Sequence, residues 1–394
     1  MAENRSKEKR TRKRKPKLKL QAYIVRPFLM CLLIFTVANL IFPTKQHSES
    51  ENRSLTQRPK LTLSSVLSGS FMEQYESYQT DQFIGRDFFR SVKVRIDSLS
   101  GKKEENGVFN GKKGQLLEDI VVPDKESLDK NLEAIRTFRQ SFPDLTASMI
   151  LVPDAAAVLD DKLPSLATVA DQSVLIKSVK RTIGEDVSWI DAESVMKAHK
   201  NEKIYYKTDH HWTTLGAYYV FQESGDALGI QSKDEQSTFL PYPVTTSFNG
   251  SLASKSGYET KAKEQIDIYV PQDDIQVVVN QVEEKKKITS LYSSDNLKSK
   301  DKYMVFLGGN YGLLDIKTTA NSARRLIVFK DSYANCFIPF LTPYFREIVV
   351  VDPRYYSGNA TDLMSTYGIT DMLFLYNANT FFVDNNISGV LTGE

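Results

Sequence analysis

Three residues of this chain have side chains that can act together in acyl transfer. Asp209 and His211 lie two positions apart in YYKTDHHWTT (205–214), and Ser332 follows an apolar run in LIVFKDSYAN (326–335). A serine hydroxyl becomes a nucleophile when a histidine removes its proton, and a carboxylate holds that histidine in one tautomer. These residues are therefore a candidate Ser–His–Asp set.

The chain contains four histidines, so there are few candidates for the base. His47 lies in a polar segment and His199 lies between lysines, whereas His210 and His211 are adjacent. Side chains two residues apart point to the same side of an extended segment. If this segment is extended, Asp209 reaches Nδ1 of His211 and leaves Nε2 free. His210 then points the other way, toward structure or substrate.

Other interpretations of these residues remain open. Asp209, His210 and His211 are also metal-ligand types, although adjacent side chains that point apart supply at most two ligands to one ion. The two histidines can instead be purely structural. At the serine, the simpler alternative is that Asp331 or Ser332 caps the following helix. We expect no metal and no cofactor.

An acyl-transfer site also needs hydrogen-bond donors for the oxyanion. The backbone N–H groups at the start of the helix after Ser332 are candidates, because helix N-termini present unpaired N–H groups. Gly309 and Asn310 follow the apolar YMVFL and allow a close approach of backbone to an anion, although an ordinary glycine turn is the alternative. Tyr376 and Asn377, at the end of another apolar run, are further candidates for substrate contact.

Helical and strand-like patterns alternate from residue 125 onward. Apolar residues recur at spacings of three and four over 128–142, which predicts an amphipathic helix. Alternation of this kind predicts a mostly parallel sheet covered on both faces, with ligand sites outside the carboxyl ends of the strands. Ser332 lies at such an end. The expected strands are SMILVP (148–153), VSWID (187–191), RLIVF (325–329), EIVVVD (347–352) and DMLFLYN (371–377).

The amino terminus combines a basic tail with an apolar run. Residues 1–20 carry ten Lys or Arg against two Glu, a net charge of +8 in a chain whose total is +2. Residues 27–43 contain no charge over seventeen positions. About twenty apolar residues cross a bilayer, and flanking positive charge stays in the cytoplasm. We therefore expect a cytoplasmic tail (1–22) without a nucleic-acid role and a single-pass anchor in the cell membrane (23–43). A cleaved signal peptide is the rival interpretation.

The remainder is expected to lie outside the cell. Residues 44–105 are expected to form a polar linker followed by a helical stalk over about 66–99, and 106–394 a globular ectodomain. Within it, 238–303 is rich in β-type residues and is expected to be an antiparallel insertion. Cys31 lies in the apolar run and Cys336 far along the chain, so we expect no intrachain disulfide.

Several segments resemble a known family. YYKTDHHWTTLGAYYVF (205–221) and FKDSYANCFIPFL (329–341) resemble the DHHW family of Gram-positive surface proteins, which is similar to the AlgJ/AlgX branch of the SGNH hydrolases. ENRSLTQRPKLT (51–62), NGVFNGKKGQLL (106–117) and LVPDAAAVLDDKLP (151–164) resemble family segments in the expected order. One departure is the pair Ala155 and Ala156, where the family pattern has a lysine or another polar residue.

The resemblance implies an SGNH-like three-layer α/β/α fold with Ser332 as nucleophile, His211 as base and Asp209 as its orienting group. It also implies a membrane-anchored, extracytoplasmic serine acyltransferase that O-acetylates a cell-surface polysaccharide through an acyl-serine. A multi-pass membrane acyltransferase of the MBOAT type would be the acetyl donor. The alternatives are a carbohydrate acetylesterase of the same fold and a non-catalytic glycan-binding surface protein.

Overall fold

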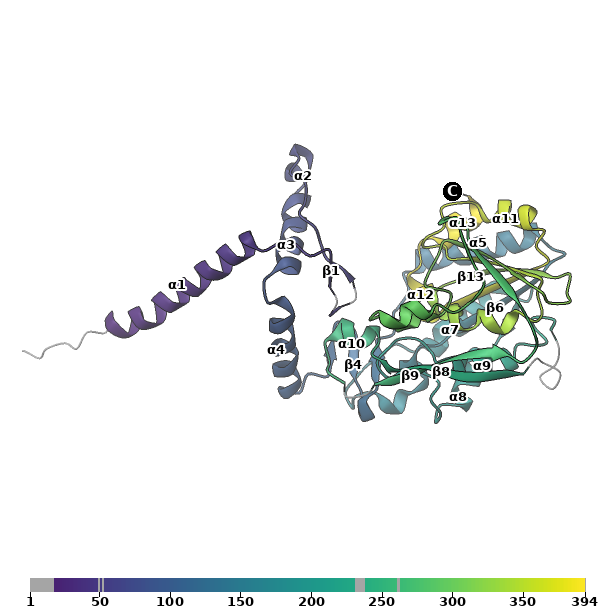
Figure 1. The fold of residues 1–394 in the computed structure, drawn as a ribbon, viewed down its shortest axis with the longest axis horizontal. Coiled ribbons are helices and arrows are strands. Elements are labelled where there is room, and N and C mark those ends of the chain that lie inside the picture. Colours follow the sequence, from purple (N-terminus) through teal and green to yellow (C-terminus); the bar gives the residue numbers. More distant parts are fainter. Residues whose placement is uncertain (1–17, 49, 52, 231–237, 261–262, 394) are drawn as a thin grey trace, which may run out of the picture. The chain divides into compact units, whose positions relative to one another are not determined.

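The structure is a computed structural model that describes residues 18–48, 50–51, 53–230, 238–260 and 263–393 (Figure 1). The chain divides into a smaller unit, residues 1–48 with 53–90, and a larger unit, residues 49–52 with 91–394. Most of the expected basic tail, residues 1–17, lies outside the described residues. The candidate site lies entirely in the larger unit.

The first helix, α1 (Leu18–Ile41), covers most of the expected anchor. Arg26, Pro27 and Asn39 interrupt its apolar sequence. Its Phe35 ring stacks on Phe83 of the same unit at a centroid distance of 5.7 Å. Within the described part of the chain, none of the helices has both the length and the apolar character needed to cross a membrane.

The segment expected to be a linker and one long helix is more structured and more divided than predicted. β1 (His47–Ser48) pairs with β2 (Arg53–Ser54), and the Asp81 carboxylate accepts hydrogen bonds from Arg53 and from the backbone of Thr56. Gly69 and Gly85 adopt left-handed backbone conformations, which divide the stalk. The resulting helices are α2 (Leu63–Leu67), α3 (Ser70–Gln82) and α4 (Arg86–Leu99).

An eight-stranded sheet forms the centre of the larger unit, in the order β11-β10-β12-β14-β13-β15-β6-β7. The strands from β14 to β7 are parallel, whereas β12, β10 and β11 pair antiparallel at one edge. The five apolar runs predicted as strands form the parallel part, so the predicted mixed α/β fold with a mostly parallel sheet is confirmed. These strands are β6 (Thr146–Val152), β7 (Ser188–Ile190), β13 (Arg325–Lys330), β14 (Glu347–Val351) and β15 (Asp371–Asn377).

Both faces of this sheet are buried. Ile327 and Phe329 of β13 point into one core, and Leu326 and Val328 point into the other, as the two-residue period of a strand requires. The first core is covered by α5 (Lys125–Ser141), α7 (Gln172–Ile183), α11 (Ala360–Tyr367), α12 (Ala378–Val383) and α13 (Ile387–Thr392), and the second by α8 (Ala192–Ala198) and α9 (Thr214–Gln222). In Figure 1, α5, α11 and α13 lie on one side of the sheet, and α8 and α9 lie on the other.

The β-rich segment 238–303 is only in part a separate insertion. β8 (Phe239–Phe248) and β9 (Glu264–Pro271) form their own antiparallel pair, and the short helix α10 (Ser251–Ser256) lies between them. However, β10 (Val277–Gln281) and β11 (Lys286–Ile288) join the central sheet, where β10 pairs with β12 (Leu313–Thr318). This pairing satisfies backbone groups of β12 that would otherwise form an open edge.

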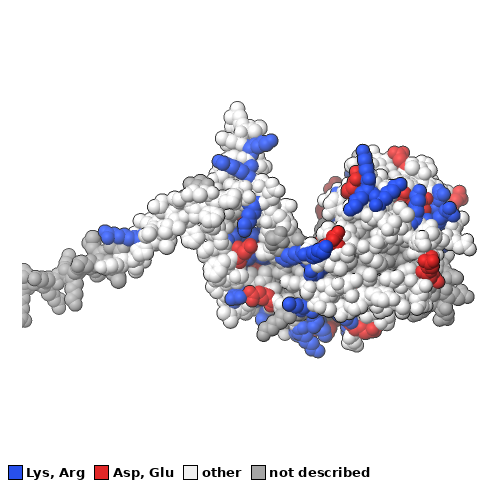
Figure 2. Space-filling model, viewed as in Figure 1, with Lys and Arg blue, Asp and Glu red and all other residues white. Residues whose placement is uncertain are grey.

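A three-stranded antiparallel sheet begins the described globular part, close to the expected residue 106. It consists of β3 (Glu104–Glu105), β4 (Val108–Asn110) and β5 (Leu116–Glu118). On the face of the larger unit drawn in Figure 2, basic and acidic side chains lie in small mixed groups. Shorter helices are α6 (Ala155–Val158) and the 3₁₀ turns η1 (Lys112–Gly114), η2 (Asp160–Lys162), η3 (Ser294–Lys298), η4 (Lys302–Val305), η5 (Ser332–Cys336) and η6 (Ile338–Leu341).

Candidate active site

The structure brings Ser332, His211 and Asp209 into one hydrogen-bonded row. Ser332 Oγ lies 2.8 Å from His211 Nε2, and His211 Nδ1 lies 2.5 Å from Asp209 Oδ1. The serine and the histidine are 121 positions apart in the sequence. Asp209 and His211 are almost fully buried, whereas Ser332 is partly exposed, so a substrate can approach the hydroxyl.

Backbone hydrogen bonds close the loop that carries Asp209 and His211. Tyr205 and Trp212 form an isolated antiparallel bridge, and the Thr213 N–H donates to Ile204 O at 2.9 Å. α9 starts immediately after this loop, because the Thr213 hydroxyl caps it by accepting from the Gly216 N–H. The loop is therefore a closed turn fixed to a helix, and not the extended segment expected from the sequence.

A buried carboxylate from the β-rich segment accepts hydrogen bonds from the loop that carries Asp209 and His211. Glu264, at the start of β9, accepts hydrogen bonds from the backbone N–H groups of Lys207 and Thr208, each at 2.8 Å. It also accepts from the Thr208 hydroxyl at 2.6 Å. These three bonds satisfy polar groups that would be costly to bury unpaired, so Glu264 fixes the turn just before Asp209.

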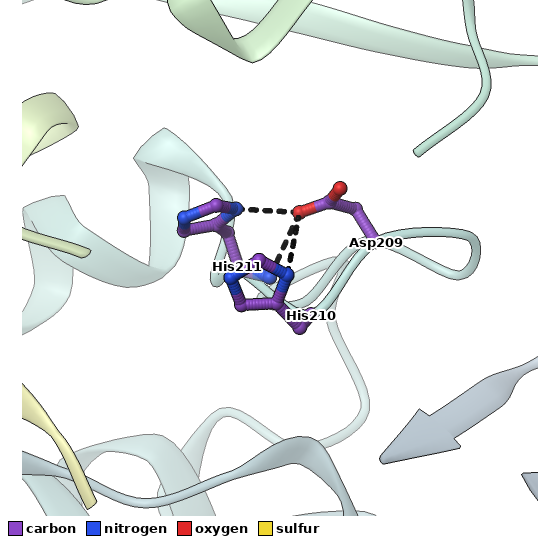
Figure 3. A group of neighbouring side chains, drawn as sticks. All are labelled: Asp209, His210 and His211. Atoms are coloured by element: carbon purple, nitrogen blue, oxygen red, sulfur yellow. Dashed lines mark hydrogen bonds and ion pairs between the residues drawn. The ribbon is translucent and has the colours of Figure 1, made fainter. Parts of the chain in front are cut away.

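Both oxygens of Asp209 accept hydrogen bonds, and Figure 3 shows the interactions of one of them, Oδ1, with the two histidines. Oδ1 accepts from the His211 backbone N–H at 3.0 Å as well as facing Nδ1, and Oδ2 accepts from the Ser251 N–H at 2.7 Å. Gly250 is required beside it, because a Cβ there would lie 2.3 Å from the Asp209 Cβ. Burial opposes ionisation of Asp209, but His211, His210 and these hydrogen bonds hold its pKa well below the usual range. The carboxylate is thus charged and fixed in orientation.

Two aromatic rings enclose the His211 imidazole. The Tyr303 ring stacks on the imidazole at a centroid distance of 3.7 Å and an interplanar angle of 12°. The His210 ring also contacts the imidazole, at a centroid distance of 3.9 Å and an interplanar angle of 35°. Burial, assisted by the neighbouring His210, lowers the pKa of His211 to about 4, although Asp209 opposes the shift. The imidazole is therefore neutral near pH 7 and has Nε2 available to accept a proton from Ser332.

Ser332 is the first residue of η5 and follows the end of β13 by two positions. The helix cap is Asp331, whose Oδ1 accepts from the Tyr333 N–H at 2.9 Å and whose Oδ2 accepts from the Asn377 N–H at 2.9 Å. Because Asp331 performs the capping, the hydroxyl of Ser332 is left to face His211. The sequence left open whether this segment caps a helix or carries a nucleophile. In the structure, Asp331 is the cap and Ser332 is the residue in the position of a nucleophile.

Reciprocal hydrogen bonds join the loop to η5. Trp212 Nε1 donates to Tyr333 O at 2.9 Å, and the Tyr333 hydroxyl donates to His210 O. Both aromatic side chains are fully buried. The distance between His211 and Ser332 is therefore set by rigid, packed groups on either side of it. Trp212 therefore acts in packing.

A cluster of buried charged side chains contacts the turn that contains Asn310. In the parallel register of β13 and β14, Phe329 is opposite Val351, which places Lys330 beside Asp352. Lys330 Nζ lies 3.1 Å from Asp352 Oδ2, and Arg354 Nη2 lies 2.7 Å from the same oxygen. Burial disfavours charge on Asp352, but Arg354 and Lys330 keep its pKa below the usual range.

This cluster fixes the side-chain amide of Asn310. Lys330 Nζ donates to Asn310 Oδ1 at 3.1 Å, and Asn335 Nδ2 donates to the same oxygen at 3.0 Å. Because an ammonium can only donate, Oδ1 must face Lys330 and the Nδ2 donors must face away from it. Asn335 lies three residues after Ser332 on a 3₁₀ turn, where positions i and i+3 share a face. Asn310 therefore contacts Asn335, a residue that shares one face of η5 with Ser332.

Not all the predicted donors are available. The Gly309 N–H donates to Phe306 O at 3.2 Å, which excludes it as a free oxyanion donor. Among the described residues, the Ser332 N–H and Asn310 Nδ2 have no hydrogen-bond partner. These two groups remain as donors for an oxyanion.

Two of the predicted substrate contacts are wrong. Tyr376 is fully buried and packs in the core on one face of the sheet, since alternate residues of β15 point to opposite faces. Asn377 is also buried, where its Oδ1 caps α12 and its backbone N–H supports Asp331. Both therefore act in structure.

The expected orientation of His210 is also wrong. Because the loop turns, the His210 ring lies against His211 instead of pointing away, and its Nδ1 is 2.6 Å from Ser251 Oγ. Its role in substrate contact stays a prediction. Ligand atoms of Asp209, His210 and His211 lie within 4.8 Å of one another, so a metal ion has three possible ligands here. Binding an ion through His211 would require breaking its hydrogen bond to Ser332 or to Asp209.

Sequence reasoning missed several residues that position the site: Glu264, Gly250, Tyr303, Lys330 and Asn335. A signal was present for two of them. Lys330 ends an otherwise apolar strand run, and Asn335 follows Ser332 at helical spacing in DSYAN. Cys336, in contrast, is buried, and burial raises the pKa of its thiol to about 12, which excludes a nucleophilic role at neutral pH.

A strand-end serine in hydrogen-bond reach of a histidine, itself bonded to a buried carboxylate, defines an α/β protein equipped for acyl chemistry at the carboxyl edge of its sheet. The family model of DHHW proteins matches residues 144–351, more than half of the chain, and the chain belongs to the DHHW family. The resemblance expected from the sequence is thus confirmed.

Solved structures with the same fold include a DHHW family protein from Eubacterium siraeum, 25% identical at a TM-score of 0.63, covering 74% of this chain and 96% of that one. Bacillus cereus PatB1 is 20% identical at a TM-score of 0.59, covering 71% and 97%. The O-acetyltransferase domain of Pseudomonas putida AlgJ is 15% identical at a TM-score of 0.48, covering 73% and 99%. No curated protein matches the sequence.

Proposed function

We propose that this chain is an extracytoplasmic serine acyltransferase that transfers acetyl groups to a polysaccharide through an acyl-serine intermediate. The observation that carries the proposal is the hydrogen-bonded row from Ser332 through His211 to Asp209. Membership of the DHHW family agrees with it. The choice of transfer over hydrolysis, and of polysaccharide as acceptor, rests on the family resemblance.

In the first half-reaction, Ser332 Oγ attacks the acetyl carbonyl carbon while its proton passes to His211 Nε2. The charge on the carbonyl oxygen is stabilised by the Ser332 N–H and Asn310 Nδ2. Collapse of this tetrahedral species breaks the bond to the donor alcohol, which takes the proton from Nε2. Asp209 stabilises the imidazolium that exists between these two steps. The products are acetyl-Ser332 and the free donor alcohol.

In the second half-reaction, a sugar hydroxyl attacks the acetyl-serine carbonyl and gives its proton to His211 Nε2. Breaking of the ester bond then returns this proton to Ser332 Oγ, so the enzyme is regenerated. Water in place of the sugar would give acetate and an esterase. The test is to supply purified residues 44–394 with 4-nitrophenyl acetate, with and without oligosaccharide. Acetylated sugar supports transfer, whereas acetate alone in both reactions contradicts it.

The pH dependence of acylation provides a test of His211. A pKa of about 4 predicts that the rate constant stays nearly level from pH 8 down to about 5 and then falls, reaching half its plateau near pH 4, because protonated His211 cannot accept the serine proton. The measurement is the initial rate of labelling by a sulfonyl fluoride across this range. A sulfonyl adduct has been described for PatB1 of B. cereus. A midpoint near the ordinary histidine value of 6.5 would contradict the proposed environment.

Metal removal separates this mechanism from the metal interpretation of Asp209, His210 and His211. We expect treatment with EDTA to leave acetyl transfer unchanged, because His211 Nε2 serves Ser332 directly. Added Zn²⁺ is expected to inhibit by competing for the imidazoles. Activity that is lost on EDTA treatment and restored by a metal ion would favour metal chemistry instead.

We also propose that α1 attaches the protein to a membrane, with the larger unit outside the cell and a membrane acyltransferase as acetyl donor. Supporting observations are the exposed apolar side chains along α1, such as Tyr23, Leu33 and Ile41, each more than 60% exposed. Membrane fractions from cells making the full chain, or a chain without residues 1–43, provide the test. Recovery of both proteins in the aqueous fraction would contradict this attachment.

A further inference from the structure

A polar cavity of about 540 Å³ lies beside the turn that carries Asn310. Its lining includes Gly308 and Tyr311, which flank Asn310 in the sequence. Asn310 in turn accepts from Asn335, on the Ser332 face of η5. The cavity and the turn that carries Ser332 are thus connected through Asn310 and its hydrogen bond to Asn335. We propose that this cavity binds the acceptor, a neutral, hydroxyl-rich segment of polysaccharide.

The side chains that line the cavity suit sugar hydroxyls. Amides and aliphatic hydroxyls, which both donate and accept hydrogen bonds, make up half of the lining residues. Two tyrosines add ring surface, on which pyranose faces can stack. The Tyr292 hydroxyl is committed to Tyr269 O at 2.6 Å, so that residue presents ring and not hydroxyl. The polar lining consists of Gln281, Thr289, Ser290, Ser293, Ser294 and Asn296.

The lining of the cavity carries little net charge, so it lacks the cluster of cations that would select an anionic ligand. Its lining contains one cation, Lys286, and one anion, Asp295. Asp295 is paired with Lys298 at 2.9 Å. A second cavity of about 590 Å³, lined in part by Lys102, Lys103 and Lys112, is more basic and involves none of the residues around Ser332. The two cavities therefore differ in chemistry and in their relation to the site.

The cavity is preformed. Asn296 Nδ2 donates to Met304 O at 2.9 Å and to Gly308 O at 3.2 Å, which ties η3 to the turn before Asn310. On the other wall, β10 and β11 are paired in the central sheet. A rigid site of this size, within the usual range for small ligands, binds without a large ordering cost. An acceptor held there would lie next to the turn whose amide serves the oxyanion.

The inference rests on the proposed function, because an acceptor exists only if the protein transfers acetyl groups. Binding of the sugar can nevertheless be measured separately from acetyl transfer. Ser332→Ala protein would be titrated calorimetrically with a neutral N-acetylglucosamine tetramer and with a uronic acid tetramer of equal length. We expect the neutral tetramer to bind at least about tenfold more tightly. Thr289→Trp, which fills the cavity from an exposed position, is expected to weaken its binding by at least about tenfold. The matched control is Ser165→Trp in the second cavity, where no change is expected.

A second measurement uses active protein. Tyr311→Ala is expected to raise the acceptor KM in transfer by about tenfold, with Tyr311→Phe close to wild type. Ser165→Trp, which lies outside both this cavity and the residues around Ser332, is expected to keep acceptor-free hydrolysis of 4-nitrophenyl acetate within about twofold of wild type. Equal effects of Thr289→Trp and Ser165→Trp, tighter binding of the anionic tetramer, or an unchanged acceptor KM in Tyr311→Ala would overturn the proposal. Failure of the proposed function would appear differently, as wild-type protein that binds the sugar but never forms an acetyl-serine.

Discussion

Ser332→Ala is expected to lower the rate of acetyl transfer by about 10⁴-fold or more, because the described residues place no other hydroxyl in hydrogen-bond contact with His211 Nε2. The hydroxyl makes its bond to His211 at a partly exposed position, and Asp331 retains the helix cap in the variant. The fold is therefore expected to survive, with a melting temperature close to that of the wild type. The measurement is transfer from 4-nitrophenyl acetate to oligosaccharide, together with labelling by a sulfonyl fluoride.

Ser322→Ala is the matched control for this variant. Ser322 is also partly exposed, and its Oγ accepts one local hydrogen bond from the Arg324 N–H. We expect it to retain wild-type transfer and labelling. If Ser332→Ala protein were labelled and active to the same extent as Ser322→Ala protein, Ser332 would not be the nucleophile.

Asp209→Asn is expected to lower transfer by about 10³- to 10⁴-fold, the second-largest effect. Both carboxylate oxygens accept hydrogen bonds, from His211 on one side and from the Ser251 N–H on the other. The asparagine side chain has one oxygen that accepts and one NH₂ group that donates. If the oxygen faces His211, the NH₂ group meets the Ser251 N–H. If the NH₂ group faces His211, it meets the backbone N–H of His211 and forces the imidazole into the wrong tautomer. The unsatisfied group should also reduce the free energy of unfolding by about 1–3 kcal/mol.

Because Asp209→Asn affects both stability and chemistry, its control is another buried carboxylate. Asp81 belongs to the smaller unit, where it accepts hydrogen bonds from Arg53 and Thr56. Asp81→Asn is expected to lower stability and to leave kcat unchanged. Equal losses of kcat in the two variants, measured well below their melting temperatures, would assign Asp209 a structural role only.

Local sequence patterns were sufficient for the parallel part of the sheet. The runs LIVF (326–329) and IVVV (348–351) are apolar at every position because β13 and β14 are buried on both faces. The same patterns did not predict that β10 and β11 would extend this sheet, because edge pairing depends on backbone groups far apart in the sequence. Gly69 and Gly85 indicate where the stalk divides, but their left-handed conformations appear only in the structure.

For the site, residue type and spacing pointed to Asp209, His211 and Ser332. They did not predict correctly how the neighbouring residues His210, Tyr376 and Asn377 lie. His210 was expected to point away because an extended loop was assumed, whereas the turn held by Glu264 folds its ring against His211. Tyr376 and Asn377 were assigned to the surface from their place at a strand end, yet helix α12 starts there and covers them. The contact of Lys330 with Asp352 depends on the register between two parallel strands, which composition does not encode.

The most direct test of the central claim is mass spectrometry of the protein quenched in acid after mixing with 4-nitrophenyl acetate. The account predicts one added acetyl group, located on Ser332 by peptide mapping and removed when oligosaccharide is present before the quench. Both Ser332→Ala and His211→Ala proteins are expected to remain unmodified. Transfer of acetyl to sugar by a wild-type protein that never carries acetyl on Ser332 would contradict the account.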